Sequence, residues 1–395
     1  MKRKIILLLF CMSFILNSCN KKNSLELDLE YVSNIPNDGL KITIKEGLKD
    51  IKVERTYLLT EGQYKGYNYA YPEIIKLNDT SLMMVAKSSV ANIQDFANAD
   101  LIKLLSFDKG KTWKEGNYTS TPFPGAINSS MPSILRIDKN KLVLIYLVKY
   151  SDNRIDLKIE NSDDNGKTWS VPSTIYGENQ GYQIINNSRA ILVGKTIYLP
   201  VCIPDGGTMN SYLKGATSLA VFYYYSEDYG KSWKKSKAIK SPIYDLLEPG
   251  LTSINNKELL YNIRTDKGKV LFARSFDLGQ TWRLEESNIN SPSSPQTIKR
   301  IPGTDKLIMV WNDSQLNVAT HGGNRSPLSL ATSSDGGRSW TKLLNLEPFN
   351  NYVKDYAYVA IEFDDEYAYF AYNERDNKKS SFAIKMSKIK LNLLK

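Results

Sequence analysis

The sequence predicts an all-β propeller built from four-stranded antiparallel blades. The first observation is a repeated pattern, Ser-x-Asp-x-Gly-x-Ser/Thr-Trp, which we call the box; it occupies residues 106–113, 162–169, 226–233, 275–282 and 333–340. The second is that short runs of alternating hydrophobicity fill the intervals, as in YQIINN, AILVG, TIYLPVCI and LAVFYYYS between the second and third boxes. About four short strands per repeat are typical of a propeller blade.

The box has the chemistry of a hairpin turn. Its Gly can adopt a positive φ without steric cost, and its Asp can accept hydrogen bonds from the backbone of the turn. Five of the six Trp in the chain lie in boxes, where we expect them to pack between sheets. A catalytic acid is needed once rather than five times, so we interpret the five box aspartates as structural.

The N-terminal residues predict export. Residues 1–18 have a basic start followed by an apolar run, as a signal peptide does, and the ending Leu-Asn-Ser-Cys is typical of a lipoprotein in which Cys19 is lipidated. We expect a lipid-anchored protein of the cell envelope, in the outer membrane and facing the periplasm or the surface. The alternative is an ordinary signal peptide with a chance cysteine. Residues 19–54 are predicted to be a tether and N-terminal strand region.

Composition excludes several classes of function. The formal net charge is +10, but no basic cluster interleaved with aromatic residues indicates a nucleic-acid partner. With His321 as the only histidine, neither a His-rich metal site nor a Ser-His-Asp triad is indicated. No phosphate-binding glycine loop stands out, and we expect no cofactor, no metal and no obligate protein partner. Cys202 is expected to be a small buried core residue.

The boxes resemble the Asp-boxes, or BNR repeats, of bacterial members of the sialidase (neuraminidase) superfamily. The resemblance runs from about residue 55 to residue 390 and implies a six-bladed β-propeller over residues 55–395. The sixth blade has no box. We expect it to combine the strands that follow Trp340 with an N-terminal strand, which would close the ring.

The resemblance also implies an exo-glycosidase that hydrolyses terminal sialic acid, or a related acidic sugar, from glycoconjugates with retention. Family sialidases use a Tyr nucleophile, a Glu that activates it and an Asp acid/base. Tyr358 in DYAYVAIEF matches the nucleophile, and Glu248 in LLEPG matches the activating Glu. Asp95 is the better match to the acid by position, and Asp100 is the alternative.

Arginines bind the substrate carboxylate in this family, because a guanidinium donates two parallel hydrogen bonds to it. Arg264 and Arg325 match two of the three family arginines, but Ala70 in YAYP stands where the first is expected. Arg189 could supply a charge from another blade. The departure leaves two alternatives open: a non-catalytic glycan-binding propeller, and a glycosidase or lyase acting on uronate-containing polysaccharide.

Overall fold

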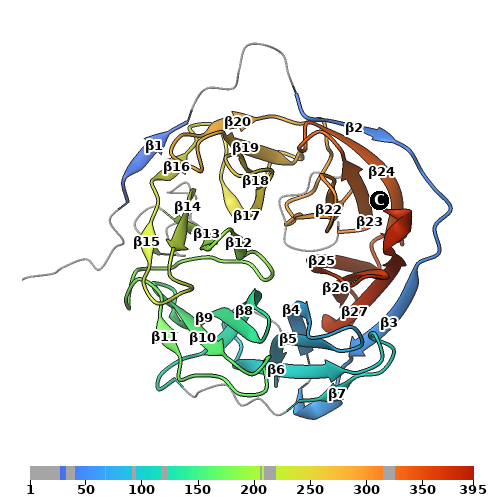
Figure 1. Cartoon of the computed structure of the whole chain (residues 1–395), viewed down its shortest axis with the longest axis horizontal. Coiled ribbons are helices and arrows are strands. Elements are labelled where there is room, and N and C mark those ends of the chain that lie inside the picture. The colour runs from blue at the N-terminus through green and yellow to red at the C-terminus, as the bar shows by residue number, and fades with distance from the viewer. Residues whose placement is uncertain are drawn as a thin grey trace, which may run out of the picture.

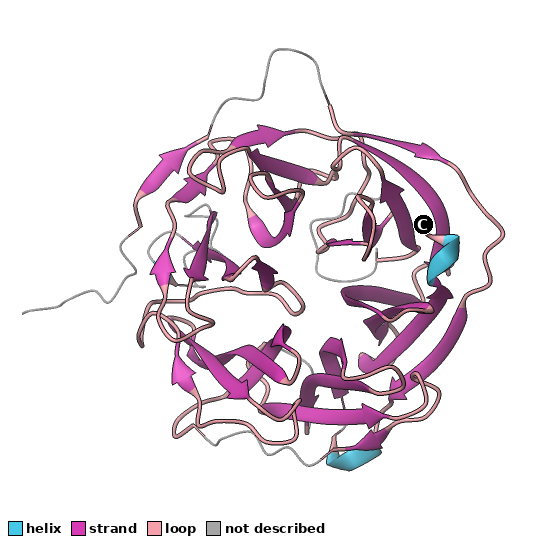
Figure 2. Cartoon of the chain, viewed as in Figure 1, coloured by secondary structure: helices cyan, strands magenta, loops and turns pink. Residues whose placement is uncertain are grey.

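The computed structural model describes residues 27–32, 41–66, 68–90, 95–116, 123–204, 207–208, 219–314 and 325–395. The predicted signal peptide, Cys19 and His321 lie outside these ranges. Figure 1 shows the sheets arranged as a ring around a central axis. Within the described ranges nearly all regular structure is strand; the short 3₁₀ helices η1 (Gln63–Lys65) and η3 (Leu391–Leu393) are seen in Figure 2. The predicted all-β propeller is therefore confirmed.

The largest sheet has eight strands. It contains two successive runs of four, first β4 (Asn68–Lys76), β5 (Leu82–Ser89), β6 (Ala99–Ser106) and β7 (Lys114–Glu115), then β8 (Asn128–Asp138), β9 (Lys141–Ser151), β10 (Arg154–Ser162) and β11 (Ser173–Thr174). The runs are joined by one parallel pair, Ala99 with Asn128. Because of this bridge, the described strands form five hydrogen-bonded sheets of four to eight strands, so the predicted six blades of four strands each are not found as such.

Two further sheets carry an additional N-terminal edge strand. One consists of β12 (Ile191–Val193), β13 (Thr196–Pro204), β14 (Leu219–Ser226), β15 (Lys234–Lys235), β16 (Ala238–Lys240) and β1 (Leu29–Tyr31). The other consists of β21 (Thr297–Arg300), β22 (Leu307–Asn312), β23 (Leu328–Ser333), β24 (Ser339–Glu347) and β2 (Thr43–Glu46). Because β1 and β2 pair parallel to β16 and β24, the described part of the predicted tether region contributes to the sheets.

The ring closes as the sequence predicts. The sheet between these two has the strands β17 (Leu247–Ser253), β18 (Leu259–Arg264), β19 (Leu271–Ser275) and β20 (Arg283–Glu285). The last sheet combines β25 (Lys354–Phe363), β26 (Tyr367–Asp376) and β27 (Ser381–Lys390) with the N-terminal β3 (Glu54–Leu59). β3 pairs antiparallel to β27, so strands from the two ends of the chain form one sheet.

The boxes are hairpin braces. In the first, both the Thr112 backbone N–H and the Ser106 hydroxyl donate to Asp108 Oδ1 at 2.9 Å, and the Thr112 hydroxyl donates to Oδ2 at 2.6 Å. These hydrogen bonds hold the pKa of Asp108 at about 2. The Asp–Ser/Thr hydroxyl bond recurs in all four other boxes, which confirms the structural interpretation.

Candidate active site

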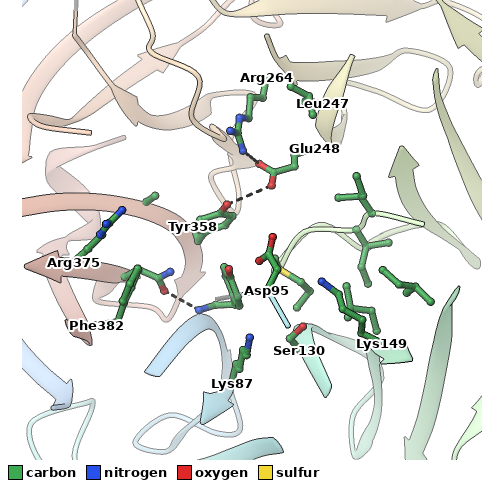
Figure 3. Close-up of a pocket in the computed structure, with 18 of the residues that line it drawn as sticks. Lys87, Asp95, Ser130, Lys149, Leu247, Glu248, Arg264, Tyr358, Arg375 and Phe382 are labelled. Atoms are coloured by element: carbon green, nitrogen blue, oxygen red, sulfur yellow. Dashed lines mark hydrogen bonds and ion pairs between the residues drawn. The ribbon is translucent and has the colours of Figure 1, made fainter. Parts of the chain in front are cut away.

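A cavity of about 460 Å³ lies at the centre of the ring (Figure 3). Its walls come mainly from the innermost strands of the sheets and the residues beside them, and none of the box residues lines it. The cavity gathers charges of both signs. Its cations are Lys87, Lys149, Arg264, Arg325 and Arg375, and its acids are Asp95, Glu248 and Asp355.

Four of the residues that line the cavity occupy a recurring backbone feature. Tyr71, Met131, Glu248 and Tyr358 all have positive φ, between 39° and 60°. Each lies on the innermost strand of its run, at a point where the pairing register shifts as in a β-bulge. A β-bulge changes the direction in which a side chain points, and non-glycine residues with positive φ are common at functional sites.

The bulges have a sequence signature that could have located the site. In three of the four bulges a Pro follows the positive-φ residue, in Tyr-Pro-Glu at 71–73, Met-Pro-Ser at 131–133 and Glu-Pro-Gly at 248–250; in the fourth, Tyr-Val-Ala at 358–360, the second residue is Val. A Ser with positive φ begins the related triplet Ser-Arg-Ala at 188–190. This repeat marks the inner strands, just as the box marks the outer hairpins.

Tyr358, Glu248 and Arg264 form a hydrogen-bonded chain. The Tyr358 hydroxyl donates to Glu248 Oε1 at 3.3 Å, and Arg264 Nη1 donates to Glu248 Oε2 at 2.7 Å. Burial, and then the charge of Glu248, raise the pKa of Tyr358, whereas the nearby arginines lower it. The phenol is therefore neutral in the resting site, with an acceptor for its proton already in place.

Arg325 lies on the face of the Tyr358 ring, with its guanidinium carbon 5.6 Å from the ring centroid. Its Nη2 donates to the Ser293 carbonyl at 3.1 Å, and Arg264 Nε donates to the Ser293 hydroxyl at 3.1 Å. Both predicted arginines thus contact one residue. The arrangement places two guanidinium groups beside the Tyr358–Glu248 pair.

The two candidates for the acid are separated by the structure. Asp95 lines the cavity with an exposed side chain, and its carbonyl accepts a hydrogen bond from Asn128 Nδ2 at 2.9 Å. Figure 3 shows the Asp95 side chain near Glu248 and Tyr358, and its charge acts on Tyr358. Asp100 is exposed on β6 and does not line the cavity. Geometry therefore brings Asp95, and not Asp100, to the other predicted residues.

The structure does not bring Arg189 to the cavity. Its side chain is buried, and Nη1 donates to the Thr297 hydroxyl at 2.7 Å, while the Thr297 hydroxyl donates to the Val359 carbonyl at 2.7 Å. Arg189 therefore links inner strands within the core. Ala70 is fully buried and faces Lys87 across the β4–β5 pair.

Sequence reasoning missed three cations that line the cavity: Lys87, Lys149 and Arg375. Each lies on the second strand of its run, where alternation alone cannot distinguish a side chain at the cavity from one at the surface. The structure pairs Lys87 with Ala70 across β4 and β5, a register that only the folded sheet defines.

The described part of the chain holds no group of three or more His, Cys, Asp or Glu residues that could bind a metal ion. Among the same residues, no helix has the length and apolar character needed to cross a membrane. Cys202, predicted to be a core residue, is fully buried with a free thiol.

The chain is similar in fold to known sialidases. Hadza microbial sialidase Hz136 superposes with a TM-score of 0.68 at 18% identity, covering 86% of this chain and 69% of that one. Trypanosoma rangeli sialidase in complex with sialic acid gives 0.65 at 16% identity, with 87% and 59% coverage, so this chain spans less than two thirds of it.

A protein of unknown function from Dyadobacter fermentans gives a TM-score of 0.65 at 15% identity, with 86% of this chain and 99% of that chain covered. No curated protein matches the sequence. The family model for the BNR repeat-like domain matches residues 128–374. The chain therefore belongs to the BNR repeat-like family.

Proposed function

We propose that this protein is a retaining exo-glycosidase that removes terminal sialic acid, or a related acidic sugar, from glycoconjugates. The observation that carries the proposal is the Tyr358–Glu248 hydrogen bond of 3.3 Å, set between Arg264 and Arg325 in a cavity that also contains Asp95. A nucleophile joined to its base, an acid across the cavity and fixed cations are the parts that glycosyl transfer to water requires.

In the first step, the Tyr358 oxygen attacks the anomeric carbon as its proton passes to Glu248. The bond to the leaving group breaks, and Asp95 donates a proton to the departing oxygen. In the second step, water attacks the anomeric carbon and gives a proton to Asp95, while Glu248 returns its proton to Tyr358. A neutral nucleophile suits an anionic sugar because it does not repel the substrate carboxylate.

Arg264 and Arg325 would hold that carboxylate. Arg325 lines the cavity, and its Nε has no hydrogen-bond partner among the described residues. Arg375 Nε is in the same condition, and Arg375 also lines the cavity. We propose that Arg375 contributes a third positive charge where Ala70 provides none.

The test is release of fluorophore from a sialoside and from a panel of uronate glycosides, with wild-type protein and with Tyr358→Phe. We expect release from the sialoside by the wild type and none by the variant, which keeps the ring but loses the attacking oxygen. Folding of the variant is checked by its urea unfolding curve. Inactivity of the wild type on every glycoside would instead support a glycan-binding propeller.

A uronate glycosidase is the second candidate, favoured by Ala70 at the position of the missing arginine. Release from uronates alone would establish it. We further propose that the two four-strand runs of the eight-stranded sheet are two blades, which gives six blades in all. Export as a lipoprotein through Cys19 also stays a proposal, tested by metabolic labelling with a fatty acid.

A further inference from the structure

We propose that Lys87 and Lys149, which we call the lysine pair, bind a second anionic group of the substrate, either a carboxylate or a sulfate. The inference rests on the proposed function, because it refines the sugar that the cavity accepts. It predicts a glycan that is negatively charged at two places rather than one.

The lysine pair is built into the cavity wall. Lys87 on β5 is only 1% exposed, and its ammonium lies 5.8 Å from the centroid of the Tyr71 ring. Lys149 on β9 is 5% exposed; its ammonium donates to the Tyr182 hydroxyl at 2.8 Å and lies 4.6 Å from the Phe96 centroid. Both side chains line the cavity, so both ammoniums are buried beside space that a ligand can enter.

The lysine pair is separate from the arginines that would bind the first carboxylate. Tyr71 packs edge-on against Tyr358 with centroids 4.7 Å apart, and Lys87 lies over the Tyr71 ring. Arg325 contacts Tyr358 instead. Figure 3 shows Lys87 and Lys149 at the opposite end of the cavity from Arg264. Lys87 and Lys149 therefore face the cavity from a different side than Arg264 does.

The electrostatics of this end favour an incoming anion. Burial lowers the pKa of both lysines, and that of Lys87 falls to about 8. The negative charge of Asp95 acts in the opposite direction and raises the pKa of both lysines. Lys87 and Lys149 both line the cavity, so a ligand anion that enters there would meet two positive charges.

The alternative is that the two ammoniums donate only to sugar hydroxyls. Hydroxyl binding predicts no advantage for a second charge, so ligands that differ only in charge distinguish the two. Suitable ligands are N-acetylneuraminic acid, its 8-O-sulfate and α2,8-linked disialic acid. The 8-O-sulfate tests a sulfate as the second anion, and disialic acid tests a second carboxylate.

Binding of these three sugars is measured by calorimetry in the Tyr358→Phe background, so that none is consumed. We expect one or both doubly anionic sugars to bind at least about tenfold more tightly than the singly anionic one. A tenfold gain in affinity corresponds to the lower end of the coupling energies measured for close, desolvated charge pairs. Lys87→Met or Lys149→Met should remove this preference and leave binding of N-acetylneuraminic acid nearly unchanged.

Lys103→Met is the matched control, because Lys103 is also a buried lysine of the same sheet but does not line the cavity. It should keep the preference. Equal affinity for all three sugars, or a preference that survives both cavity substitutions, would overturn the inference. Release from a singly charged sialoside by the wild type would still support the proposed function, so the two failures are distinguishable.

Discussion

Replacing Glu248 with glutamine separates its charge from its shape. Glu248 Oε2 accepts from Arg264 Nη1 at 2.7 Å, with the two side chains 10% and 2% exposed. Glutamine keeps an oxygen that can accept this hydrogen bond but loses the negative charge. Because hydrogen bonds to charged groups contribute about 1.5–3 kcal/mol, we expect a loss of that size in the free energy of unfolding. Removing the acceptor altogether, in Glu248→Ala, should cost about 3–5 kcal/mol.

The effect on turnover should be larger than the effect on stability explains. An amide cannot take the proton of Tyr358, and a general base typically contributes at least about a hundredfold in rate. We therefore expect Glu248→Gln to lower kcat by at least about that factor in the fluorogenic release assay, while urea unfolding shows that the protein is folded under the assay conditions.

Glu285→Gln is the matched control. Glu285 accepts from Arg274 Nε at 2.9 Å in the same sheet as Glu248, with the side chains 8% and 0% exposed, but it does not line the cavity. It should lose similar stability and keep turnover. If Glu248→Gln loses stability as expected but releases fluorophore at the wild-type rate, the role of Glu248 as base is refuted.

Three further predictions concern the boxes, Ala70 and Cys202. Hydrogen bonds within the boxes lower the pKa of Asp108, Asp164 and Asp228 from the ordinary 3.8 to about 2, so the stabilisation that these aspartates give is present above about pH 4 and is lost as the pH falls towards 2. Thermal unfolding should show this fall, and a flat profile would contradict it. Ala70→Arg should lower the free energy of unfolding in urea by at least about 1–3 kcal/mol, because Ala70 is fully buried, and it should not speed release of the fluorophore. Faster release without loss of stability would show that position 70 still reaches the substrate. Burial raises the pKa of Cys202 to about 12, so its thiol should react with a disulfide reagent only in urea, and labelling of the folded protein would be the opposite result.

The fold was largely predictable because its signal repeats. Each box carries its own turn chemistry, so five copies indicate the same hairpin five times, and the hydrogen bonds to Asp108 have the expected pattern. The number of separate sheets was not predictable in this way. It depends on one parallel pair, Ala99 with Asn128, between residues that no local pattern relates.

The sequence predicts the site residues only in segments that resemble family motifs. The family resemblance predicts Glu248, Arg264, Arg325 and Tyr358, and the structure brings all four to one cavity. Only charge indicates Arg189; the direction of its side chain depends on how the inner strands pack, and it lies in the core.

The missed cations have a different physical cause. Lys87, Lys149 and Arg375 lie on second strands, where a charged residue in an alternating run usually faces solvent. In a closed ring, the ends of these strands turn towards the central cavity, which only the assembled sheets define. The sequence alone therefore could not distinguish a cavity lysine from a surface one.

The most direct test of the central claim is to trap the proposed glycosyl-enzyme bond. The protein is incubated with a 2,3-difluoro analogue of sialic acid, digested, and its peptides are identified by mass spectrometry. We expect a sugar adduct on Tyr358 that is absent from the Tyr358→Phe variant. An adduct on any other residue, or release of sialic acid by a protein that never forms an adduct, would contradict it.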